Sequence, residues 1–350
     1  MPTKDDLRYF QAMPLDIKIA MTKQRIREWV REYGENGVYV SFSGGKDSTV
    51  LLDLVRQEFP NVEAVFVNTG LEYPEIQRFV KTFDNVTTLR PAMRFDEVIR
   101  KYGYPIIGKE VSESVSQARI ALERNDGKYT YRLKKLKGTA TDTNGNLSKY
   151  NTPKYEPLLY TDFRIGGGCC SVMKKRPAKQ YEKKTGKKPI VAVMASESRA
   201  REGAWYRTGC NSFDSSRPIS RPMSFWTEQD VLQYIKQNKL PTASVYGEIV
   251  ETDSDGCEYT SNLLGEKIGS YKTTGCSRTG CIFCGFGCHL EKEPSRFQRL
   301  KQTHPRQYEY CIGGGEYDQD GLWVPNKEGL GMGHVFDTLN KIYGDGFIKY

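Results

Sequence analysis

The chain has 350 residues, of which 38% are hydrophobic and 12% aromatic, so it can bury a core as one large or two modest domains. No apolar stretch approaches the roughly 20 residues of a membrane span, and the start, MPTKDDLRYF, lacks the basic and then apolar pattern of a signal peptide. We therefore expect a cytoplasmic protein with no membrane partner. The net charge of +9 suits nucleic acid, phosphorylated small molecules or solubility alone.

The chain contains nine cysteines. An odd number of cysteines in a reducing compartment argues against a disulfide framework. Thiolate ligands or redox-active cysteines are the expected alternative.

The first predicted helix runs from Asp16 to Tyr33, where apolar residues recur at helical spacing until Gly34 closes the run. The β-rich run Val38–Val40 then precedes a glycine turn and an amphipathic run at Val50–Val55. This order predicts a strand, a turn and a helix N-terminus.

The turn between these two runs is typical of an anion site. Gly44 and Gly45 let the backbone approach a phosphate, the N–H groups of the first helical turn point at it, and Lys46 adds a positive charge. The hydroxyls of Ser43 and Ser48 can donate to the same oxygens. For a lone Gly-Gly pair, an ordinary strand-to-helix turn is the alternative.

Further strands are predicted at Ala64–Val67 and Val86–Leu89, followed by helices that begin at Pro74 and that cover Phe95–Tyr102. Alternating strands and helices predict an α/β fold, a doubly wound parallel sheet covered on both faces. Ligands of such sheets bind at the carboxyl ends of the strands. The residues expected there besides the glycine turn are Asn68, Thr69 and Gly70.

Residues 124–160 interrupt this rhythm with a turn-rich run, Asp142–Asn146, and a basic cluster. The cluster consists of Arg132, Lys134, Lys135 and Lys137. We expect an inserted basic loop on the surface, for which a hairpin is one form. It is either a solvated loop or an arm that contacts a polyanionic substrate. The nearby tyrosines either stack on bases or are half-buried packing residues; they are Tyr129, Tyr131, Tyr150 and Tyr155.

The α/β pattern resumes with a predicted strand at Ile190–Met194 and a capping box at Thr227–Asp230, which predicts a helix through Ile235. From Gly247 onward the density of glycine and cysteine rises. We therefore expect a nucleotide-binding domain at residues 1–250, carrying the insertion at about 124–160, and a smaller Cys-rich region with helices at residues 251–350.

The string SGGKDS at Ser43–Ser48 resembles the PP-loop of the ATP pyrophosphatase superfamily, and not a Walker loop, which needs GxxxxGK[ST]. Three more patterns follow it: CCSVMKKRP from Cys169, ESRARE from Glu197, and a run from Trp226 that closes with TGCIFC at Cys284. Together, from about Val38 to Cys288, they look like the phosphoadenosine phosphosulfate (PAPS) reductase family. That family includes adenylylsulfate reductases and the PP-loop sulfur-transfer enzymes of DNA phosphorothioation.

This resemblance implies a Rossmann-type, HUP-like fold in which ATP or an adenylyl compound is cleaved or attacked at the α-phosphate. It implies catalytic roles for Lys46, for Asp47 as a Mg²⁺ ligand, and for Arg199 near a bound phosphate or sulfate. A salt bridge of Arg199 with Glu197 or Glu202 is the alternative. The implied nucleotide-binding residues are Ser41, Phe42, Ser43, Gly44, Gly45, Lys46, Asp47, Ser48, Asn68, Thr69 and Gly70.

The resemblance also implies a four-iron cluster. Its implied ligands are Cys169, Cys170, Cys281 and Cys284, with Lys174 beside them. A rival set with C-x4-C-x2-C-x3-C spacing would hold zinc or a cluster by itself; its members are Cys276, Cys281, Cys284 and Cys288. Buried inert thiols are the third interpretation.

Two departures from the reductase pattern favour ATP cleavage over sulfate reduction. No cysteine follows Cys311, where reductases carry a catalytic tail cysteine, and the loop Ser43–Ser48 has the complete ATP-type form. The leading hypothesis is therefore acceptor adenylation with pyrophosphate release, coupled to iron–sulfur-dependent sulfur transfer. Its expected partners are an adenine nucleotide and either nucleic acid or a sulfur-donor protein. An adenylylsulfate reductase using Cys311 or Cys288, and a non-catalytic zinc-containing nucleic-acid-binding protein, are the alternatives.

Overall fold

The computed structural model describes residues 2–124, 127–252 and 270–350, and the chain divides into two compact units. Unit 1 comprises residues 1–68, 72–90 and 177–279, and unit 2 comprises residues 69–71, 91–176 and 280–350. These units differ from the two domains expected on either side of residue 250, because residues 91–176 pack with the C-terminal part of the chain.

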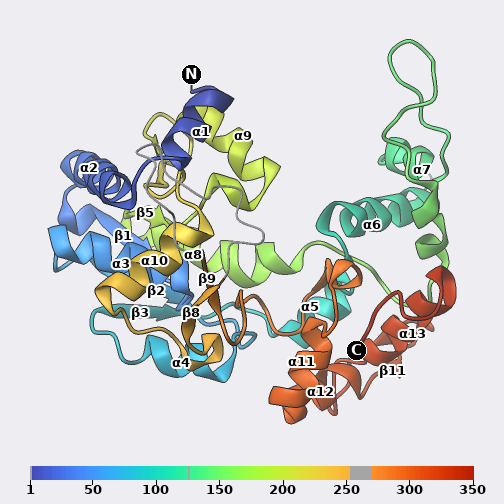
Figure 1. Ribbon diagram of the computed structural model, residues 1–350. Coiled ribbons are helices and arrows are strands. Elements are labelled where there is room, and N and C mark those ends of the chain that lie inside the picture. The colour runs from blue at the N-terminus through green and yellow to red at the C-terminus, as the bar shows by residue number, and fades with distance from the viewer. Residues whose placement is uncertain (1, 125–126, 253–269) are drawn as a thin grey trace. The chain divides into compact units, whose positions relative to one another are not determined.

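Unit 1 is built on a six-stranded sheet with the strand order β3-β2-β1-β5-β7-β6. Figure 1 labels β3, β2, β1 and β5 of this sheet. All neighbouring strands pair in parallel except β6, which runs antiparallel to β7 at the edge. The predicted α/β fold with a parallel sheet is therefore confirmed. The strands are β1 (Val38–Ser41), β2 (Ala64–Val67), β3 (Val86–Leu89), β5 (Lys188–Val191), β6 (Asn211–Ser212) and β7 (Ile219–Ser220).

The strands β2, β1 and β5 are in register, with Ser41 opposite both Val65 and Val191. The loops that follow these parallel strands consequently leave the sheet at the same edge. Strand β5 ends earlier than the predicted Ile190–Met194, because the N–H of Val193 donates to the carbonyl of Val191 and turns the chain out of the sheet.

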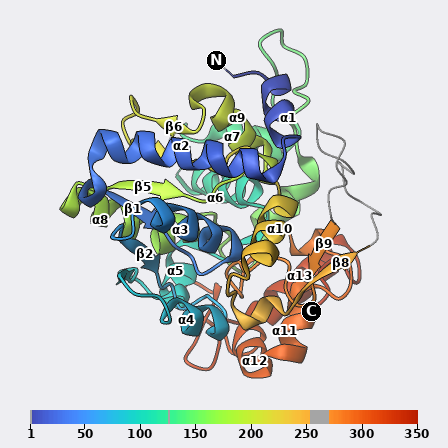
Figure 2. The ribbon, with the colours of Figure 1, turned by 60° about the vertical axis from the view of Figure 1, so that its left-hand side comes forward.

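The helices of unit 1 pack around this sheet. Helix α3 packs on α2 and on α10 (Figure 2), while the Tyr181 ring of α8 lies 5.3 Å from the ring of Tyr39 in β1. The helices predicted at Asp16–Tyr33 and after Pro74 are confirmed. The helices are α1 (Lys4–Gln11), α2 (Leu15–Tyr33), α3 (Lys46–Glu58), α4 (Pro74–Val80), α8 (Arg176–Thr185), α9 (Arg199–Thr208) and α10 (Glu228–Asn238), and the strands β8 (Ile249–Thr252) and β9 (Ser270–Thr273) form a hairpin.

The first turn of α10 is fixed by two interactions. The predicted capping box is present, with the Asp230 carboxylate accepting from the Thr227 backbone N–H at 2.6 Å. The same carboxylate accepts from the buried Lys18 ammonium at 2.7 and 2.8 Å. Burial lowers the pKa of Lys18, and the Asp230 charge opposes that shift. Removing one partner of such a buried pair lowers the free energy of unfolding by about 3–5 kcal/mol. The pair therefore holds the first turn of α10, which also carries Glu228, firmly in place.

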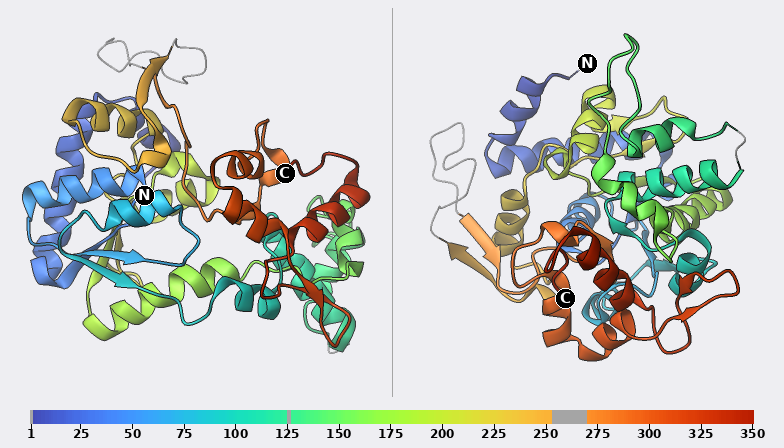
Figure 3. Two further views of the ribbon diagram at one scale, coloured as in Figure 1. Left: turned by 90° about the horizontal axis from the view of Figure 1, so that it is seen from below. Right: turned by 90° about the vertical axis from the view of Figure 1, so that its right-hand side faces the viewer.

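Unit 2 joins residues that are far apart in the sequence. Strand β4 (Ile106–Ile107) pairs in parallel with β10 (Gly285–Phe286), so the chain after α5 is bound to the C-terminal cysteine segment. Figure 3 shows the C-terminal helices, in orange and red, grouped together. The helices are α5 (Phe95–Tyr102), α6 (Lys109–Arg124), α7 (Thr130–Leu136), α11 (Arg296–Thr303), α12 (Pro305–Ile312) and α13 (Met332–Tyr343), and β11 (Glu316–Tyr317) pairs with β12 (Trp323–Val324).

The insertion expected as a loop contains two helical segments, which corrects that prediction in part. Helix α7 packs on α6, and a 3-10 segment, η2 (Pro153–Tyr160), packs on both. The helix is held because Leu136 and Leu158 are fully buried and the N–H of Thr152 donates to the carbonyl of Lys135. The predicted turn at Asp142–Asn146 is present, because the Asp142 N–H donates to the Asn146 carbonyl. Next to it, Thr141 and Leu147 form an isolated antiparallel β-bridge.

Within the described ranges, no helix is both long and apolar enough to cross a bilayer.

Candidate active site

The phosphate loop, defined here as Ser41–Ser48, joins β1 to the N-terminus of α3 in unit 1. Gly44 has φ +71, and a Cβ there would lie 2.7 Å from the Cγ2 atom of Val80. Both the backbone conformation and the contact with α4 therefore require glycine. Phe42 is buried and its ring lies 5.0 Å from that of Phe83, which anchors the start of the loop in the core.

Two serine hydroxyls hold the loop in shape. The backbone N–H of Ser43 donates to the Ser48 Oγ at 3.1 Å, and that hydroxyl donates to the Gly45 carbonyl at 2.9 Å. The Ser43 and Ser48 hydroxyls are 3.0 Å apart. The expected phosphate contacts thus lie on a loop that is already ordered by its own hydrogen bonds.

Lys46 is the first residue of α3 and its side chain is only 2% exposed. Its ammonium lies 3.0 Å from the Glu228 carboxylate of α10 and donates to the Ser277 carbonyl at 3.0 Å. Glu228 and Ser277 were not among the predicted site residues. Glu228 belonged to the capping box and to the family pattern that begins at Trp226, but neither gave it a role in the site, and no local pattern points to Ser277.

Tyr246 is a third residue that the sequence did not reveal. Its hydroxyl accepts from the Lys46 backbone N–H at 3.2 Å and lies 2.6 Å from the Thr279 hydroxyl. The segment that carries Thr279 is tied to the same place, since the N–H of Gly275 donates to the Tyr246 carbonyl. Burial raises the pKa of Tyr246, so its hydroxyl stays protonated and can serve as donor as well as acceptor.

Asp47 is the residue of the loop best suited to a cation. Its Oδ1 atom is buried and accepts no hydrogen bond from the described residues; the Lys46 ammonium lies 3.6 Å away. A carboxylate oxygen without a donor fits a Mg²⁺ ligand, because Mg²⁺ prefers oxygen ligands.

Two arginines surround this part of unit 1. Glu197 pairs with Arg201 and, at 3.2 Å, with Arg278. Burial and the neighbouring Arg278 lower the pKa of Arg201, and Asp47 opposes this shift. Arg199, the predicted residue, is exposed at the first position of α9. The charge of Arg201 thus interacts with Asp47 of the phosphate loop.

The residues after β2 are divided between the units. Asn68 belongs to unit 1, while Thr69 and Gly70 belong to unit 2. In unit 2, the Thr69 hydroxyl accepts from the Leu71 N–H at 3.2 Å, and the Leu71 carbonyl accepts from the Ile282 N–H at 2.8 Å.

Four thiols line a single small cavity in unit 2, which we call the thiol cavity. It has a volume of about 20 Å³ and also contains apolar side chains and one lysine. Its lining residues are Leu71, Phe95, Pro105, Cys169, Cys170, Met173, Lys174, Cys281 and Cys284. The structure therefore brings together the set that the family resemblance implied.

Local structure explains how these thiols meet. Cys170 precedes a π-helical turn, η3 (Ser171–Lys175), and the Cys169 and Cys170 sulfurs are 4.0 Å apart. On the other side, the Cys284 N–H donates to the Cys281 carbonyl, and the Arg296 guanidinium donates to the Cys284 carbonyl at 2.9 Å. The pairing of β4 with β10 holds this turn in unit 2.

The electrostatic environment differs between the two adjacent cysteines. The pKa of Cys170 is lowered because the Cys169 thiol donates a hydrogen bond to it and because Lys174, Lys109 and Lys175 are nearby. The pKa of Cys169 is raised by the same hydrogen bond and by burial. Cationic side chains beside the thiols would offset the negative charge of thiolate ligands.

The members of the rival set of cysteines are divided between the two units. Cys276 lies in unit 1, where its N–H donates to the Val245 carbonyl, and Cys288 is buried in unit 2 with its thiol donating to the Gly285 carbonyl. In the part of the chain that the structure describes, no group of three or more His, Cys, Asp or Glu side chains is arranged around a single metal ion. The four thiols that line the cavity are soft ligands of the kind that suit an iron–sulfur cluster or zinc.

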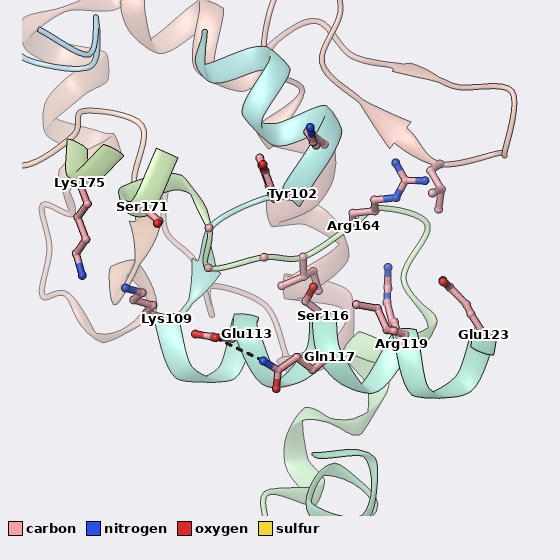
Figure 4. Close-up of a pocket in the computed structure, with 17 residues that line it drawn as sticks. Tyr102, Lys109, Glu113, Ser116, Gln117, Arg119, Glu123, Arg164, Ser171 and Lys175 are labelled. Atoms are coloured by element: carbon pink, nitrogen blue, oxygen red, sulfur yellow. Dashed lines mark hydrogen bonds between the residues drawn. The ribbon is translucent and has the colours of Figure 1, made fainter. Parts of the chain in front are cut away.

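A larger cavity of about 670 Å³, the cationic pocket, lies in the same unit along α6 (Figure 4). Lys109, Lys175 and Ser171 lie at one end, and Arg119 and Arg164 lie at the other. Ser171 directly follows Cys170, so this end of the pocket adjoins the cysteine pair in the sequence. The pocket was not predicted, because its cations come from four separate segments.

A parallel α/β sheet with a glycine-rich anion loop after its first strand defines a nucleotide-binding class of protein. A family model described as the phosphoadenosine phosphosulfate reductase domain matches residues 37–105 and 124–285. The chain therefore belongs to the PAPS reductase family, and the predicted membership is confirmed.

Individual relatives are distant. The chain is 25% identical over 212 residues to an adenosine 5'-phosphosulfate reductase of Geobacillus kaustophilus, an alignment that covers 60% of this chain and 67% of that protein. It is 24% identical over 273 residues to subunit 2 of a sulfate adenylyltransferase of Marinomonas sp., covering 72% and 77%. A crystal structure of a phosphoadenylyl-sulfate reductase from Candida auris, in a phosphate complex, aligns with a TM-score of 0.36 and 14% identity over 70% of this chain and 91% of that one.

Proposed function

We propose that this chain is an ATP pyrophosphatase of the PAPS reductase family that adenylates an acceptor and supports iron–sulfur-dependent sulfur transfer to it. The observation that carries the proposal is the complete phosphate loop, with its ordered serines, its buried Lys46 and an Asp47 oxygen that accepts no hydrogen bond from the described residues. Relatives named as adenosine 5'-phosphosulfate reductase and sulfate adenylyltransferase support chemistry on an adenylyl group.

The reaction begins with ATP at the phosphate loop. An acceptor oxygen attacks the α-phosphorus, one oxygen–phosphorus bond forms, and the bond to the bridging oxygen breaks, so that pyrophosphate leaves. The first N–H groups of α3 and the Lys46 ammonium stabilise the negative charge that grows on the phosphates. Lys46 then exchanges part of its pairing with Glu228 for the phosphate oxygens.

Two cofactors accompany these residues. Asp47 would hold Mg²⁺, which neutralises phosphate charge when bound. The four cysteines of the thiol cavity would hold an iron–sulfur cluster, which supplies a binding and redox centre for sulfur. A sulfur-donor protein provides the sulfur nucleophile, which replaces the activated oxygen of the acceptor while AMP leaves.

A direct test is the release of pyrophosphate and AMP from ATP by the anaerobically purified full chain. Lys46→Ala should lower this rate by about 100-fold or more, since removing one preorganised donor costs about 3–4 kcal/mol. Lys183→Ala, a change of an exposed lysine in α8, is the matched control and should keep the rate. Unchanged pyrophosphate release in Lys46→Ala would refute the role of the loop.

A sulfonucleotide reductase is the second candidate, because several relatives carry the name adenosine 5'-phosphosulfate reductase. In that case the same loop binds a sulfonucleotide and no pyrophosphate is released. Sulfite formation from adenylylsulfate with thioredoxin, in the absence of ATP, distinguishes this candidate.

A further inference from the structure

Residues 127–160 of unit 2, which we call the arm, contain an unusual combination of side chains. Seven are lysine or arginine, two are aspartate or glutamate, and five are tyrosine. Each of these tyrosines lies within a few positions of a cation in the sequence. This composition is the one that binds a polyanion whose units also offer flat rings for stacking.

Four of the five tyrosines of the arm are exposed, and the fifth, Tyr155, is half-buried with its ring 6.4 Å from that of Tyr343. Tyr129, Tyr131, Tyr150 and Tyr160 are between 43% and 67% exposed, and only two other tyrosines among the described residues are comparably exposed. Four exposed aromatic rings within one short segment exceed what chance exposure of single apolar residues produces. The exposed rings are therefore concentrated on the arm.

Four lysines of the arm are also exposed to solvent. They are Lys134, Lys137, Lys149 and Lys154. The Lys149 ammonium lies 5.3 Å from the centre of the Tyr150 ring, and the Lys154 ammonium lies 4.8 Å from that of Tyr155. The arm thus places an aromatic ring next to a cation at two positions. A nucleic-acid strand likewise places a flat base next to a charged phosphate.

The arm is folded and not a solvated chain. Its own core contains the fully buried Leu136 and Leu158, and the Asn151 side-chain amide donates to the carbonyls of Gly138 and Ala140 at 3.0 Å each. It is fastened to α6, where the Lys135 ammonium pairs with Glu110 at 3.1 Å. The backbone that carries the exposed rings is consequently ordered before any ligand arrives, which lowers the entropic cost of binding.

From these features we infer that the arm binds single-stranded nucleic acid, with bases stacked on its tyrosines and phosphates paired with its lysines. A duplex hides its bases inside the stack, so it would use only the lysines. This inference rests on the proposed function, because it names nucleic acid as the class of acceptor that the enzyme adenylates. The arm packs on α6, and the first residue of that helix, Lys109, lines the cationic pocket at the end that adjoins the cysteine pair.

The test is fluorescence anisotropy of the full chain with labelled oligothymidylate, oligouridylate and a duplex DNA of the same length, without ATP. We expect at least one single strand to bind about 10-fold more tightly than the duplex, and the two single-stranded probes tell DNA from RNA. The double variant Tyr131→Ala/Tyr150→Ala should weaken single-strand binding by about 10-fold or more and leave duplex binding unchanged. Tyr9→Ala, a change of a 55% exposed tyrosine in unit 1, is the matched control and should bind as the parent does.

A second variant tests the phosphate contacts. Lys134→Gln/Lys137→Gln should reduce the slope of log K against log salt by about 0.7 for each lysine, whereas Lys183→Gln/Lys184→Gln in α8 should leave the slope unchanged. Circular dichroism checks that the variants are folded.

Three results would overturn the inference: equal affinity for single strand and duplex, single-strand binding that the tyrosine changes do not affect, or binding to phosphatidylserine vesicles with none to the oligonucleotides. Because no nucleotide is present, these results are independent of pyrophosphate release. A negative result for nucleic-acid binding by the arm can therefore be distinguished from a negative result for ATP cleavage at the phosphate loop.

Discussion

In unit 1 the phosphate loop is a single run of eight residues between β1 and α3, whereas in unit 2 the thiol cavity is assembled from four separate segments. The loop is polar, and distant residues such as Glu228 and Tyr246 occupy its donors and acceptors. The cavity is mainly apolar apart from its thiols and Lys174. The loop can therefore be recognised in one run of sequence, whereas the cavity forms only when its four segments fold together.

The largest expected effect concerns the composite site. Cys281→Ser and Cys284→Ser should each abolish iron binding, because a hydroxyl is a poor ligand for iron–sulfur clusters. Cys276→Ser, in unit 1, should keep the iron of the parent protein. Iron and sulfide analysis after anaerobic purification provides the measurement. Iron loss in Cys276→Ser together with retention in a Cys169→Ser protein would instead favour the C-terminal set of cysteines.

The next prediction concerns a change in the phosphate loop that should leave the thiol cavity unaffected. Asp47→Asn should raise the Mg²⁺ concentration needed for half-maximal pyrophosphate release by at least about 10-fold, in the range known for disturbed metal sites. The Oδ1 atom of Asp47 accepts no hydrogen bond within the described structure, and the Lys46 ammonium, 3.6 Å away, keeps its pairing with Glu228 in the variant. Iron content should stay at the parental level. An unchanged Mg²⁺ requirement would rule out Asp47 as a ligand.

A smaller effect concerns the shape of the loop. Gly44→Ala should destabilise the protein by about 1–2 kcal/mol for the positive φ and by about 1–3 kcal/mol more for the clash with Val80. Gly186→Ala is the matched control, since Gly186 has φ +75 and open space around its Cβ position. Urea unfolding of both variants measures the difference. Equal losses of stability would show that packing against α4 does not shape the loop.

The smallest effect concerns a cysteine outside both sites. Burial raises the pKa of Cys210 to about 11. Thiolate accumulates only as the pH rises toward the pKa, so at about pH 8 Cys210 should react with iodoacetamide much more slowly than a free thiol. Mass spectrometry of the modified protein at several pH values gives the rate. Rapid alkylation at that pH would show that the site is more open than its burial indicates.

The elements with strong local signals were predictable from the sequence. The alternating apolar runs gave β1, β2 and β3, Pro74 marked the start of α4, and the Thr227 capping box marked α10. The phosphate loop was recognisable for the same reason, since its eight residues are contiguous.

The remaining features depend on tertiary contacts. The arm contains the helix α7 because Leu136 is buried, which its turn-rich surroundings did not indicate. The pairing of Lys46 with Glu228 joins residues that no local pattern relates. The common cavity of Cys169, Cys170 and the CxxC turn likewise depends on the pairing of β4 with β10, which holds that turn in unit 2.

The central claim is that the loop cleaves ATP at the α-phosphate. Its most direct measurement supplies the anaerobically purified chain with α-labelled ATP in one reaction and with sulfur-labelled adenylylsulfate plus thioredoxin in another. We predict that label from ATP appears in AMP or an adenylated acceptor with equimolar pyrophosphate, and that this product vanishes in Lys46→Ala. Release of sulfite from adenylylsulfate, with ATP left intact, would contradict the account and identify a reductase.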